Sequence, residues 1–450
     1  MEQVLWIKHY IFLRKECITM ILVGIDIGKT KHTFSIIDRG TGEILLTPSV
    51  LDNNQNGFLL LTKQLKAYDK ADILIGMEDT GHYHFALLKY LLDSRYTVAL
   101  INPTTTDLTR KLQGGITKND PLDSLTICDV IGSNQRKKPY RVTKVNRFEL
   151  YEQKQLTRHH HNLKEELNIY KNRLQKCIDI VFPEFNSLFR SKYGVVYMNI
   201  LKTFSSAEAI ANADIRSIRK CFEFKGQGKR ISLSADQLKS VAKSSIGIPS
   251  AAEEIQIRHL INQIELLEEQ LSEIDKRIEE FSAKSNSAIL SIPGISHFSG
   301  TSILAELGDI CNYQKSSQII KFAGVAPYHY ESSQYTAQHT AITKKGSKYL
   351  RKTLYQIILP VINNNEVFRT YYNKKLSEGK GHRCAQGHCI RKLLRVIYHL
   401  LSTGQQFNPE LLVYAITNYP FTNHLLLKVY LLRHKIHFYL YIFNVQCFAN

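Results

Sequence analysis

The chain has 450 residues, which is enough for two or three domains with their own cores. Its 44% hydrophobic and 22% charged residues are typical of a globular protein. The 59 lysines and arginines against 40 acidic residues give a net charge of +19, which favours nucleic acid, ahead of an anionic membrane surface, as a partner. The eight cysteines are scattered without a disulfide framework, as expected for a reducing cytosol.

The two ends of the chain differ in composition from the rest. Residues 1–19 lack the apolar region of a signal peptide, and Met20 directly precedes the first credible strand. We therefore interpret 1–19 as a non-native upstream extension. Residues 412–450 form an atypical apolar tail, but Lys428, Arg433 and Lys435 interrupt it, so a membrane-spanning helix is a poor interpretation.

Residues 20–145 alternate between strand and helix patterns. Gly28-Lys29-Thr30 follows an apolar run, but only three residues separate Gly24 from Gly28, where a phosphate-binding P-loop needs four. The pattern instead predicts strands over 21–27, 32–38, 42–48, 71–78 and 96–103, with helices over 56–68, 82–95 and from 119 onwards. Three antiparallel strands followed by strand–helix units predict a mixed sheet with helices packed on it.

Residues 146–285 are predicted to be helical, with two heptad patterns. The first pattern has Leu156, Leu163, Tyr170 and Cys177 alternating with His160, Leu167, Leu174 and Val181; the second has Ile257, Ile264, Leu271 and Ile278 alternating with Leu260, Leu267, Ile274 and Phe281. These helices are expected to pair with each other or across subunits, although an ordinary helical core gives the same pattern. Residues 183–250 between them are helical and less regular.

Residues 286–411 are predicted to form a further helical unit. Within it, 289–309 has the pattern of a helix-hairpin-helix, a turn that offers backbone N–H groups to phosphates. An ordinary Pro-Gly turn between two core helices fits the same residues.

Four acids lie at the edges of predicted elements. Asp26 lies inside the first strand and Glu78 ends another. Asp120 and Asp123 begin a helix with i,i+3 spacing and therefore share a face, although Asp120 also suits the capping position. An acid in an apolar strand is costly unless it is paired or bound to metal. Converging carboxylates suit Mg²⁺, and paired Mg²⁺ ions promote phosphodiester cleavage, so the residues predict a metal-dependent nuclease or strand-transferase.

The motifs "GIDIGKTKH", "GMEDTGHYH", "INP" and "KNDPLDS" resemble the acidic motifs of the IS110-type transposases, the DEDD recombinases. The resemblance, over roughly residues 20–411, implies an α/β RNase H-like (RuvC-like) N-terminal domain over 20–145. It implies coiled-coil helices over 146–285 and an all-α C-terminal transposase domain over 286–411. It also assigns Asp26, Glu78, Asp120 and Asp123 as a catalytic tetrad that binds Mg²⁺.

The segment from "IPGIS" through "GVAP" to "TKKGSKYLR" resembles the second conserved domain of that family. A serine there is understood as the nucleophile that bonds to DNA, and Ser332 falls on its position. Ser333 follows where the family usually has glycine, so either serine fits the role. The resemblance further implies donor and target DNA, a structured guide RNA encoded by the element, and a homo-oligomer, either a dimer or a tetramer.

The sequence therefore predicts a DNA transposase or recombinase of an insertion sequence, located in the bacterial cytoplasm with the nucleoid and without a membrane partner. The residues expected to contact nucleic acid are Lys344, Lys345, Lys348, Arg351, Lys352, Arg136, Lys137 and Lys138. One alternative is a catalytically decayed, nucleic-acid-binding relative. Another is an ASKHA-type sugar kinase, which shares the RNase H core; the +19 charge and the helical second half argue against it.

Overall fold

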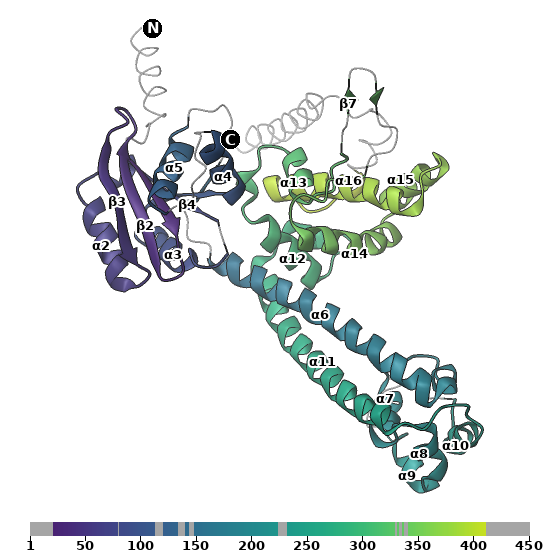
Figure 1. Ribbon diagram of the computed structural model, residues 1–450. Coiled ribbons are helices and arrows are strands. Elements are labelled where there is room, and N and C mark those ends of the chain that lie inside the picture. Colours follow the sequence, from purple (N-terminus) through teal and green to yellow (C-terminus); the bar gives the residue numbers. More distant parts are fainter. Residues whose placement is uncertain are drawn as a thin grey trace, which may run out of the picture. The chain divides into compact units, whose positions relative to one another are not determined.

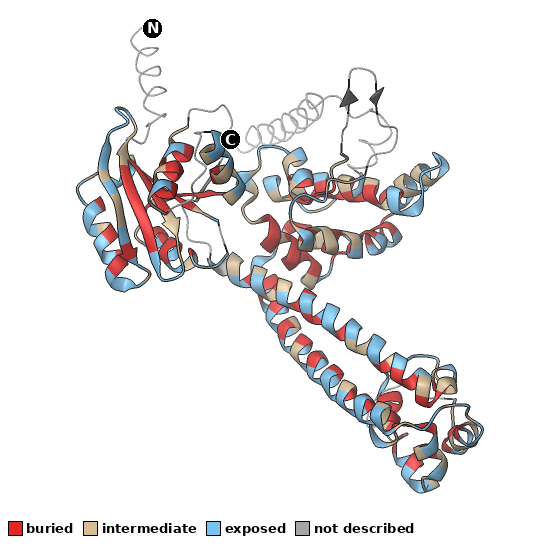
Figure 2. Ribbon diagram, in the orientation of Figure 1, coloured by how far each residue is buried: buried red, intermediate tan, exposed pale blue. Residues whose placement is uncertain are grey.

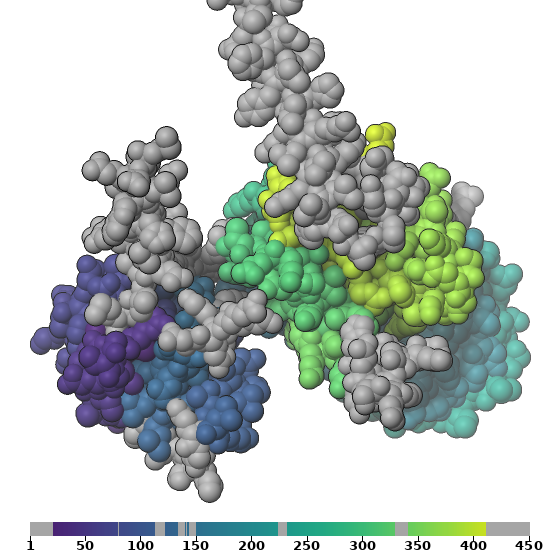
Figure 3. All heavy atoms as spheres, turned by 90° about the horizontal axis from the view of Figure 1, so that it is seen from above, coloured from purple at the N-terminus to yellow at the C-terminus, as the bar shows by residue number. Residues whose placement is uncertain are grey.

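The computed structural model describes residues 21–79, 81–112, 120–133, 140–143, 148–223, 232–328, 331–332, 335–336 and 341–410 (Figure 1). The expectations for 1–19, for 412–450 and for Arg136, Lys137 and Lys138 lie outside these residues. The chain divides into two compact units, Met1–Glu149 and Leu150–Asn450. Figure 3 colours the first unit purple to blue and the second teal to yellow, so each unit is built from one continuous part of the chain.

The first unit is built on a six-stranded sheet in the order β3-β2-β1-β4-β5-β6. Its strands are β1 (Ile21–Ile27), β2 (Lys31–Asp38), β3 (Ile44–Asp52), β4 (Ile73–Glu78), β5 (Thr97–Ile101) and β6 (Tyr140–Thr143). The first three strands pair antiparallel, whereas β4 runs parallel to β1, and β5 runs parallel to β4. The predicted mixed sheet is therefore confirmed. The edge strand β6, antiparallel to β5, is an addition, because its residues lie in a basic stretch without strand alternation.

Helices cover both faces of this sheet. They are α2 (Gln55–Leu65), η1 (Lys70–Asp72), α3 (Phe85–Asp93), α4 (Pro103–Leu112) and α5 (Asp120–Gly132). One apolar cluster joins α2 and α3 to the strands, and a separate one joins α5 to them, so α2 and α3 lie on one face and α5 on the other.

Helix α4 corrects the sequence prediction, in which Pro103 only closes a strand. Proline suits the first position of a helix, because its fixed φ is helical and its missing N–H would have no partner there. The Asn102 side chain accepts a hydrogen bond from the Thr104 backbone N–H at 3.0 Å and so stabilises this helix start.

Two long helices, α6 (Phe148–Val181) and α11 (Ala251–Ser285), form an antiparallel hairpin in the second unit (Figure 1). Their apolar residues share one core, and Figure 2 shows buried residues repeating along the facing sides. Lys171 also pairs with Glu268 across the hairpin at 2.7 Å. The heptad helices thus pair with each other within one chain. Three predicted positions, Leu156, Tyr170 and Leu260, are only partly buried, and beside Leu260 it is Ile261 that is fully buried.

Short helices connect the far ends of α6 and α11. They are η2 (Pro183–Leu188), α7 (Val195–Thr203), α8 (Ala207–Asn212), α9 (Ile215–Lys220) and α10 (Ala235–Lys243). The less regular helical pattern predicted for 183–250 is therefore confirmed for the described residues.

The remaining elements share another apolar core. They are η3 (Ala288–Ser291), α12 (His297–Leu307), η4 (Ile310–Asn312), α13 (Ser316–Phe322), α14 (Lys348–Asn364), α15 (Glu366–Ser377) and α16 (His382–Thr403). Two short strands, β7 (Glu331–Ser332) and β8 (Tyr335–Thr336), precede α14 in the chain. The expectation of an all-α C-terminal domain needs correction, because β7 and β8 pair antiparallel. The β-branched and aromatic residues of β8 favour this strand pairing.

The Pro-Gly segment at 289–309 lies between η3 and α12. Gly294 has a φ of +97°, and a Cβ there would lie 2.6 Å from the backbone N of Val361 in α14. The turn thus packs closely against the backbone of another helix. Within the described part of the chain, no helix is long and apolar enough to cross a membrane.

Candidate active site

Two of the predicted acids lie on the same face of neighbouring parallel strands. A Cβ on Gly24 would lie 2.0 Å from the Ser124 carbonyl oxygen, and a Cβ on Gly76 would lie 2.9 Å from the Ile127 side chain, so both glycines face α5. Side chains alternate along a strand, and Asp26 and Glu78 each stand two residues after one of these glycines. Both acids, which are half-buried, therefore face the α5 side at the carboxyl ends of β1 and β4.

The direction of α5 brings its N-terminal turn towards the same place. Its last residue, Gly132, lies against Leu22, whereas Ser124 lies over Gly24, so α5 runs antiparallel to β1. Two residues along a strand advance about 6.7 Å, and four residues along a helix advance about 6 Å. The first turn of α5, with Asp120 and Asp123, therefore lies near the level of Asp26. The side chain of Asp120 is outside the described residues.

The glycines permit this close packing of helix on sheet. Any side chain at position 24 would collide with the backbone of α5, and the Ser124 hydroxyl fills the remaining space by a hydrogen bond with the Ser35 hydroxyl at 2.5 Å. This close approach fixes the position of α5 against β1.

Asp123 is buried and has a cationic partner that the sequence interpretation missed. Its Oδ1 lies 3.3 Å from Nη1 of Arg110 in α4, and its side chain is 7% exposed. The other guanidinium nitrogen, Nη2, pairs with Asp107 one turn earlier on α4. Lys111 also binds Asp107, at 2.7 Å. The hydrogen bond from Lys111, followed by the Arg110 contribution, lowers the pKa of Asp107.

The donor chemistry of this region fits a divalent cation, although the described side chains do not form a ready ligand shell. Among the described residues, no three His, Cys, Asp or Glu side chains are grouped closely enough to hold a metal ion. Asp26 and Glu78 nevertheless face the α5 side of the sheet, and hard oxygen ligands are those Mg²⁺ prefers. The Arg110 guanidinium supplies the positive charge beside the Asp123 carboxylate.

Ser332 lies in the two-residue strand β7 and is paired with Tyr335 of β8. Pro327, just before this hairpin, makes a further antiparallel bridge with Ile342. The side chain of Ser332 and all of Ser333 are outside the described residues. Ser332 thus lies on a short antiparallel strand pair.

The basic residues that follow β7 and β8 fall into two groups: some are exposed, and others bind groups of the protein. Lys344, Lys345 and Lys348 are exposed around the N-terminus of α14. The Arg351 guanidinium instead donates to the Ala323 and Lys344 carbonyl oxygens, both at 3.2 Å, and so stabilises the turn before α14. Lys352 pairs with Glu165 of α6 at 2.8 Å.

A buried ion pair joins the long helix α6 to α12 and to the start of α14. The sequence interpretation missed this ion pair. Arg158 of α6 donates two hydrogen bonds to the Glu306 carboxylate, at 2.5 and 3.1 Å. The Ser347 hydroxyl, which caps α14, donates to the same carboxylate at 2.7 Å. The only local signal is Glu306 itself, an acid within an otherwise apolar helix stretch.

Buried polar residues of the same three helices, α6, α12 and α14, also contact one another. His161 Nε2 lies 3.0 Å from the Thr353 hydroxyl, which also contacts the Ser302 hydroxyl at 3.0 Å. Burial, and then the nearby Lys352 charge, lower the pKa of His161 to about 4. The histidine is therefore neutral at pH 7.

Two protein-family models match the chain over separate regions. Residues 23–183 match the model of DEDD transposases of the IS110 type, described as a transposase, and residues 286–373 match the model described as "Transposase IS116/IS110/IS902 family". Together these regions cover more than half of the chain. The chain belongs to the IS110 family of transposases. It is thus a DNA transposase or recombinase of an insertion element, and DNA is its substrate class.

Other proteins are similar to this IS110-family chain over most of their length. An IS116 insertion-element protein of Streptomyces clavuligerus is 21% identical, over 86% of this chain and 96% of its own. The pilin gene-inverting protein of Moraxella lacunata is 20% identical, over 86% and 98%. A putative mini-circle transposase for IS117 from Streptomyces coelicolor is 21% identical, over 87% and 96%.

One solved structure, the Aquifex aeolicus member of the Ppx/GppA family, aligns with 56% of this chain and 91% of its own. Its identity to this chain is 12% and its TM-score is 0.15, too low to bear on the fold.

The IS110-family regions contain both predicted parts of the site. Asp26, Glu78, Asp120, Asp123 and Arg110 fall within the first matched region. Ser332 and the basic residues after it fall within the second.

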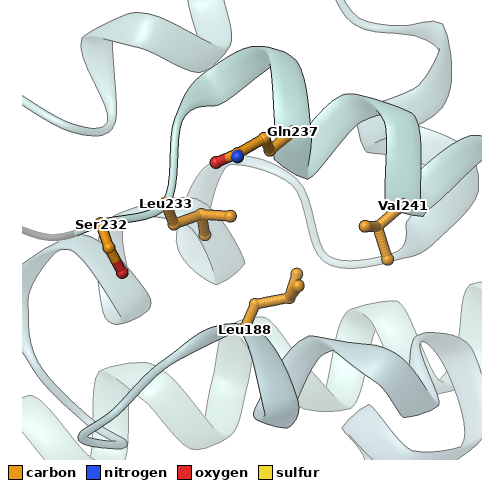
Figure 4. Close-up of a pocket in the computed structure, with 5 residues that line it drawn as sticks. All are labelled: Leu188, Ser232, Leu233, Gln237 and Val241. Carbon is orange, nitrogen blue, oxygen red and sulfur yellow. The ribbon is translucent and has the colours of Figure 1, made fainter.

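A pocket lies elsewhere in the chain, between Leu188 and α10 (Figure 4). Ser232, Leu233, Gln237 and Val241 complete its lining, and none of these side chains titrates. It follows the C-terminal end of α6, whereas the Arg158 ion pair lies near the other end. The pocket therefore has no chemistry for strand transfer.

Proposed function

We propose that this transposase cuts and rejoins DNA with Asp26, Glu78, Asp120 and Asp123 as Mg²⁺ ligands and Ser332 as the nucleophile. The observation that carries the proposal is the packing of α5 over β1 and β4. This packing supports the proposal, because it puts the first turn of α5 near the level of Asp26 on the face of the sheet that carries both strand acids. Four carboxylates gathered without a cation would repel one another, which gives the cluster a reason to bind metal.

The residues have separate roles in this mechanism. The Ser332 hydroxyl oxygen would form a bond to the phosphorus of a DNA phosphodiester, and the bond from phosphorus to the displaced sugar oxygen would break. Water would take the serine proton, and the departing sugar oxygen would take a proton from water and leave as a hydroxyl. Bound Mg²⁺ would supply electrostatic stabilisation of the charge that develops on the attacking and leaving oxygens. Asp26 and Glu78 hold their positions through the parallel pairing of β1 and β4.

An RNase H-like, RuvC-like fold is part of the proposal for residues 20–145. Three antiparallel strands lead into two parallel ones, in the order β3-β2-β1-β4-β5, and helices cover both faces. This arrangement supports the assignment and puts one acid on the central strand β1 and another on its parallel neighbour. The proposed boundaries of the coiled-coil region and the transposase domain remain 146–285 and 286–411.

The proposed partners are donor DNA, target DNA and a structured guide RNA, acting with a homo-oligomer of two or four chains in the bacterial cytoplasm at the nucleoid. Lys344, Lys345 and Lys348 would bind phosphates, since they are exposed around the start of α14. Arg351 and Lys352 would add to the positive electrostatic potential at this surface, although each already binds protein groups. Arg136, Lys137 and Lys138 are proposed on their charge alone.

A recombination assay with matched donor DNA, target DNA and element RNA tests the proposal. We expect Asp26→Ala and Ser332→Ala each to abolish strand exchange, with chelation of divalent cations giving the same loss. The exposed acid Glu43, between β2 and β3, supplies the control Glu43→Gln, and Ser333→Ala tests the neighbouring serine. Full strand exchange by both Asp26→Ala and Ser332→Ala would refute the assignment.

A further inference from the structure

Arg110 has two carboxylate partners with different surroundings. Nη2 pairs with Asp107, which is on the same helix and 39% exposed. Nη1 lies 3.3 Å from Oδ1 of Asp123, which is on α5 and 7% exposed. The guanidinium thus bridges a solvent-exposed acid and a buried acid that we propose as a metal ligand.

The two contacts of Arg110 differ in how readily they can be lost. Asp107 stands three residues before Arg110 on α4, so that pair needs no other element. The contact with Asp123 is a single long hydrogen bond between two helices. Loss of the Asp123 contact would still leave Arg110 paired, because Asp107 would retain it.

The need for a cation at Asp123 follows from its burial. An ionised carboxylate without a partner in such a position carries a large desolvation penalty. A divalent cation and the Arg110 guanidinium can each remove this penalty. The two cations compete for one oxygen, because like charges close together repel each other.

We propose that Arg110 is the built-in counter-ion of Asp123 in the metal-free protein and competes with the divalent cation for that carboxylate. The inference depends on the proposed metal site and adds a residue outside the acidic tetrad. Metal binding then releases Nη1 from Asp123, while Nη2 stays on Asp107. Arg110 thereby sets the metal concentration at which the site fills.

The test compares Mn²⁺ and Mg²⁺ binding to the full chain by titration calorimetry in Arg110→Gln and in the unaltered protein. We expect Arg110→Gln to bind the metal about tenfold more tightly, equal to about 1.4 kcal/mol, because no guanidinium has to be displaced. Lys111→Gln is the matched control, since Lys111 binds Asp107 on the same helix and, within the described part of the chain, pairs with no other carboxylate. Its metal affinity should stay within twofold of the unaltered protein.

Thermal unfolding of the same variants gives a second measurement. Without metal, Arg110→Gln should unfold at a lower temperature than the unaltered protein, because Asp123 has lost its partner. Saturating Mg²⁺ should raise its unfolding temperature by more than that of the unaltered protein. Arg110→Lys, which keeps the charge, should lie between them in both measurements.

The outcomes separate this inference from the proposed function. Equal or weaker metal binding by Arg110→Gln, with binding intact in the unaltered protein, would overturn the competition and leave the metal site standing. Metal binding that is absent from the unaltered protein, or that Asp26→Ala leaves unchanged, would overturn the proposed metal site itself and the competition with it.

Discussion

The Glu306 ion pair makes a quantitative prediction about the second unit. The Glu306 side chain is 1% exposed, and Arg158 supplies its two hydrogen bonds from a neighbouring helix. Replacement of Arg158 by methionine keeps most of the side-chain length but leaves a buried negative charge. Breaking a buried ion pair costs about 3–5 kcal/mol. We expect a loss near 3 kcal/mol for Arg158→Met, because Arg158 is itself 33% exposed and Ser347 still donates to the carboxylate.

The dependence of this loss on pH is a sharper check. Burial alone would raise the pKa of Glu306, but hydrogen bonds from Arg158 and Ser347, together with nearby positive charges, lower it below the ordinary value of 4.5. A lowered carboxyl pKa stabilises the fold above the unfolded pKa, and that stability disappears as the pH falls through the folded pKa. In Arg158→Met burial has less opposition, so the carboxyl pKa rises and protonation relieves the buried charge. The difference in stability between the two proteins should therefore shrink from pH 7 to pH 4.

Urea denaturation followed by circular dichroism at both pH values measures these differences. The control is Lys202→Met, which removes the Lys202–Glu265 pair at 2.6 Å between two half-exposed side chains. Exposed pairs contribute about 0–1 kcal/mol, so this variant should lose little. An Arg158→Met loss no larger than the control loss, or one that is the same at pH 4 and pH 7, would refute the reasoning.

Two other predictions concern buried polar groups and close packing. The pKa of His161 is lowered to about 4, so the unfolded chain takes up a proton at this residue before the folded chain does as the pH falls from 6.5. The neutral histidine therefore contributes up to about 3 kcal/mol to the free energy of unfolding above pH 6.5, and this contribution is lost towards pH 4. His161→Gln should make the urea midpoint depend less on pH over this range. An unchanged dependence of the urea midpoint on pH would count against a buried neutral His161. The second prediction concerns Gly24, where an added Cβ would lie 2.0 Å from the Ser124 carbonyl oxygen. Gly24→Ala should therefore lower the thermal midpoint by the equivalent of about 1–3 kcal/mol and reduce strand exchange. The control Gly194→Ala has nothing within 4 Å of its Cβ, and equal effects of the two would contradict this packing.

Local patterns in the sequence were sufficient for the main elements and for the candidate acids. The runs 21–27 and 73–78 are apolar and end near Asp26 and Glu78, and this signal depends on neighbouring residues only. The heptads likewise predict α6 and α11, since a helix repeats its buried face every three to four residues. The predicted positions Leu156, Tyr170 and Leu260 are nevertheless only partly buried, and Ile261 is buried beside Leu260, because the partner helix decides which side of a helix is covered.

The tertiary structure decided which distant side chains meet. Arg110 and Asp123 belong to different helices, and Arg158 meets Glu306 across 148 residues of chain. No local pattern contains these pairs, since each depends on the packing of whole helices against one another. The sequence interpretation singled out neither Arg110 nor Glu306. The fold turns each into half of an ion pair, because a charge that loses water on burial must find its partner in whatever element packs beside it.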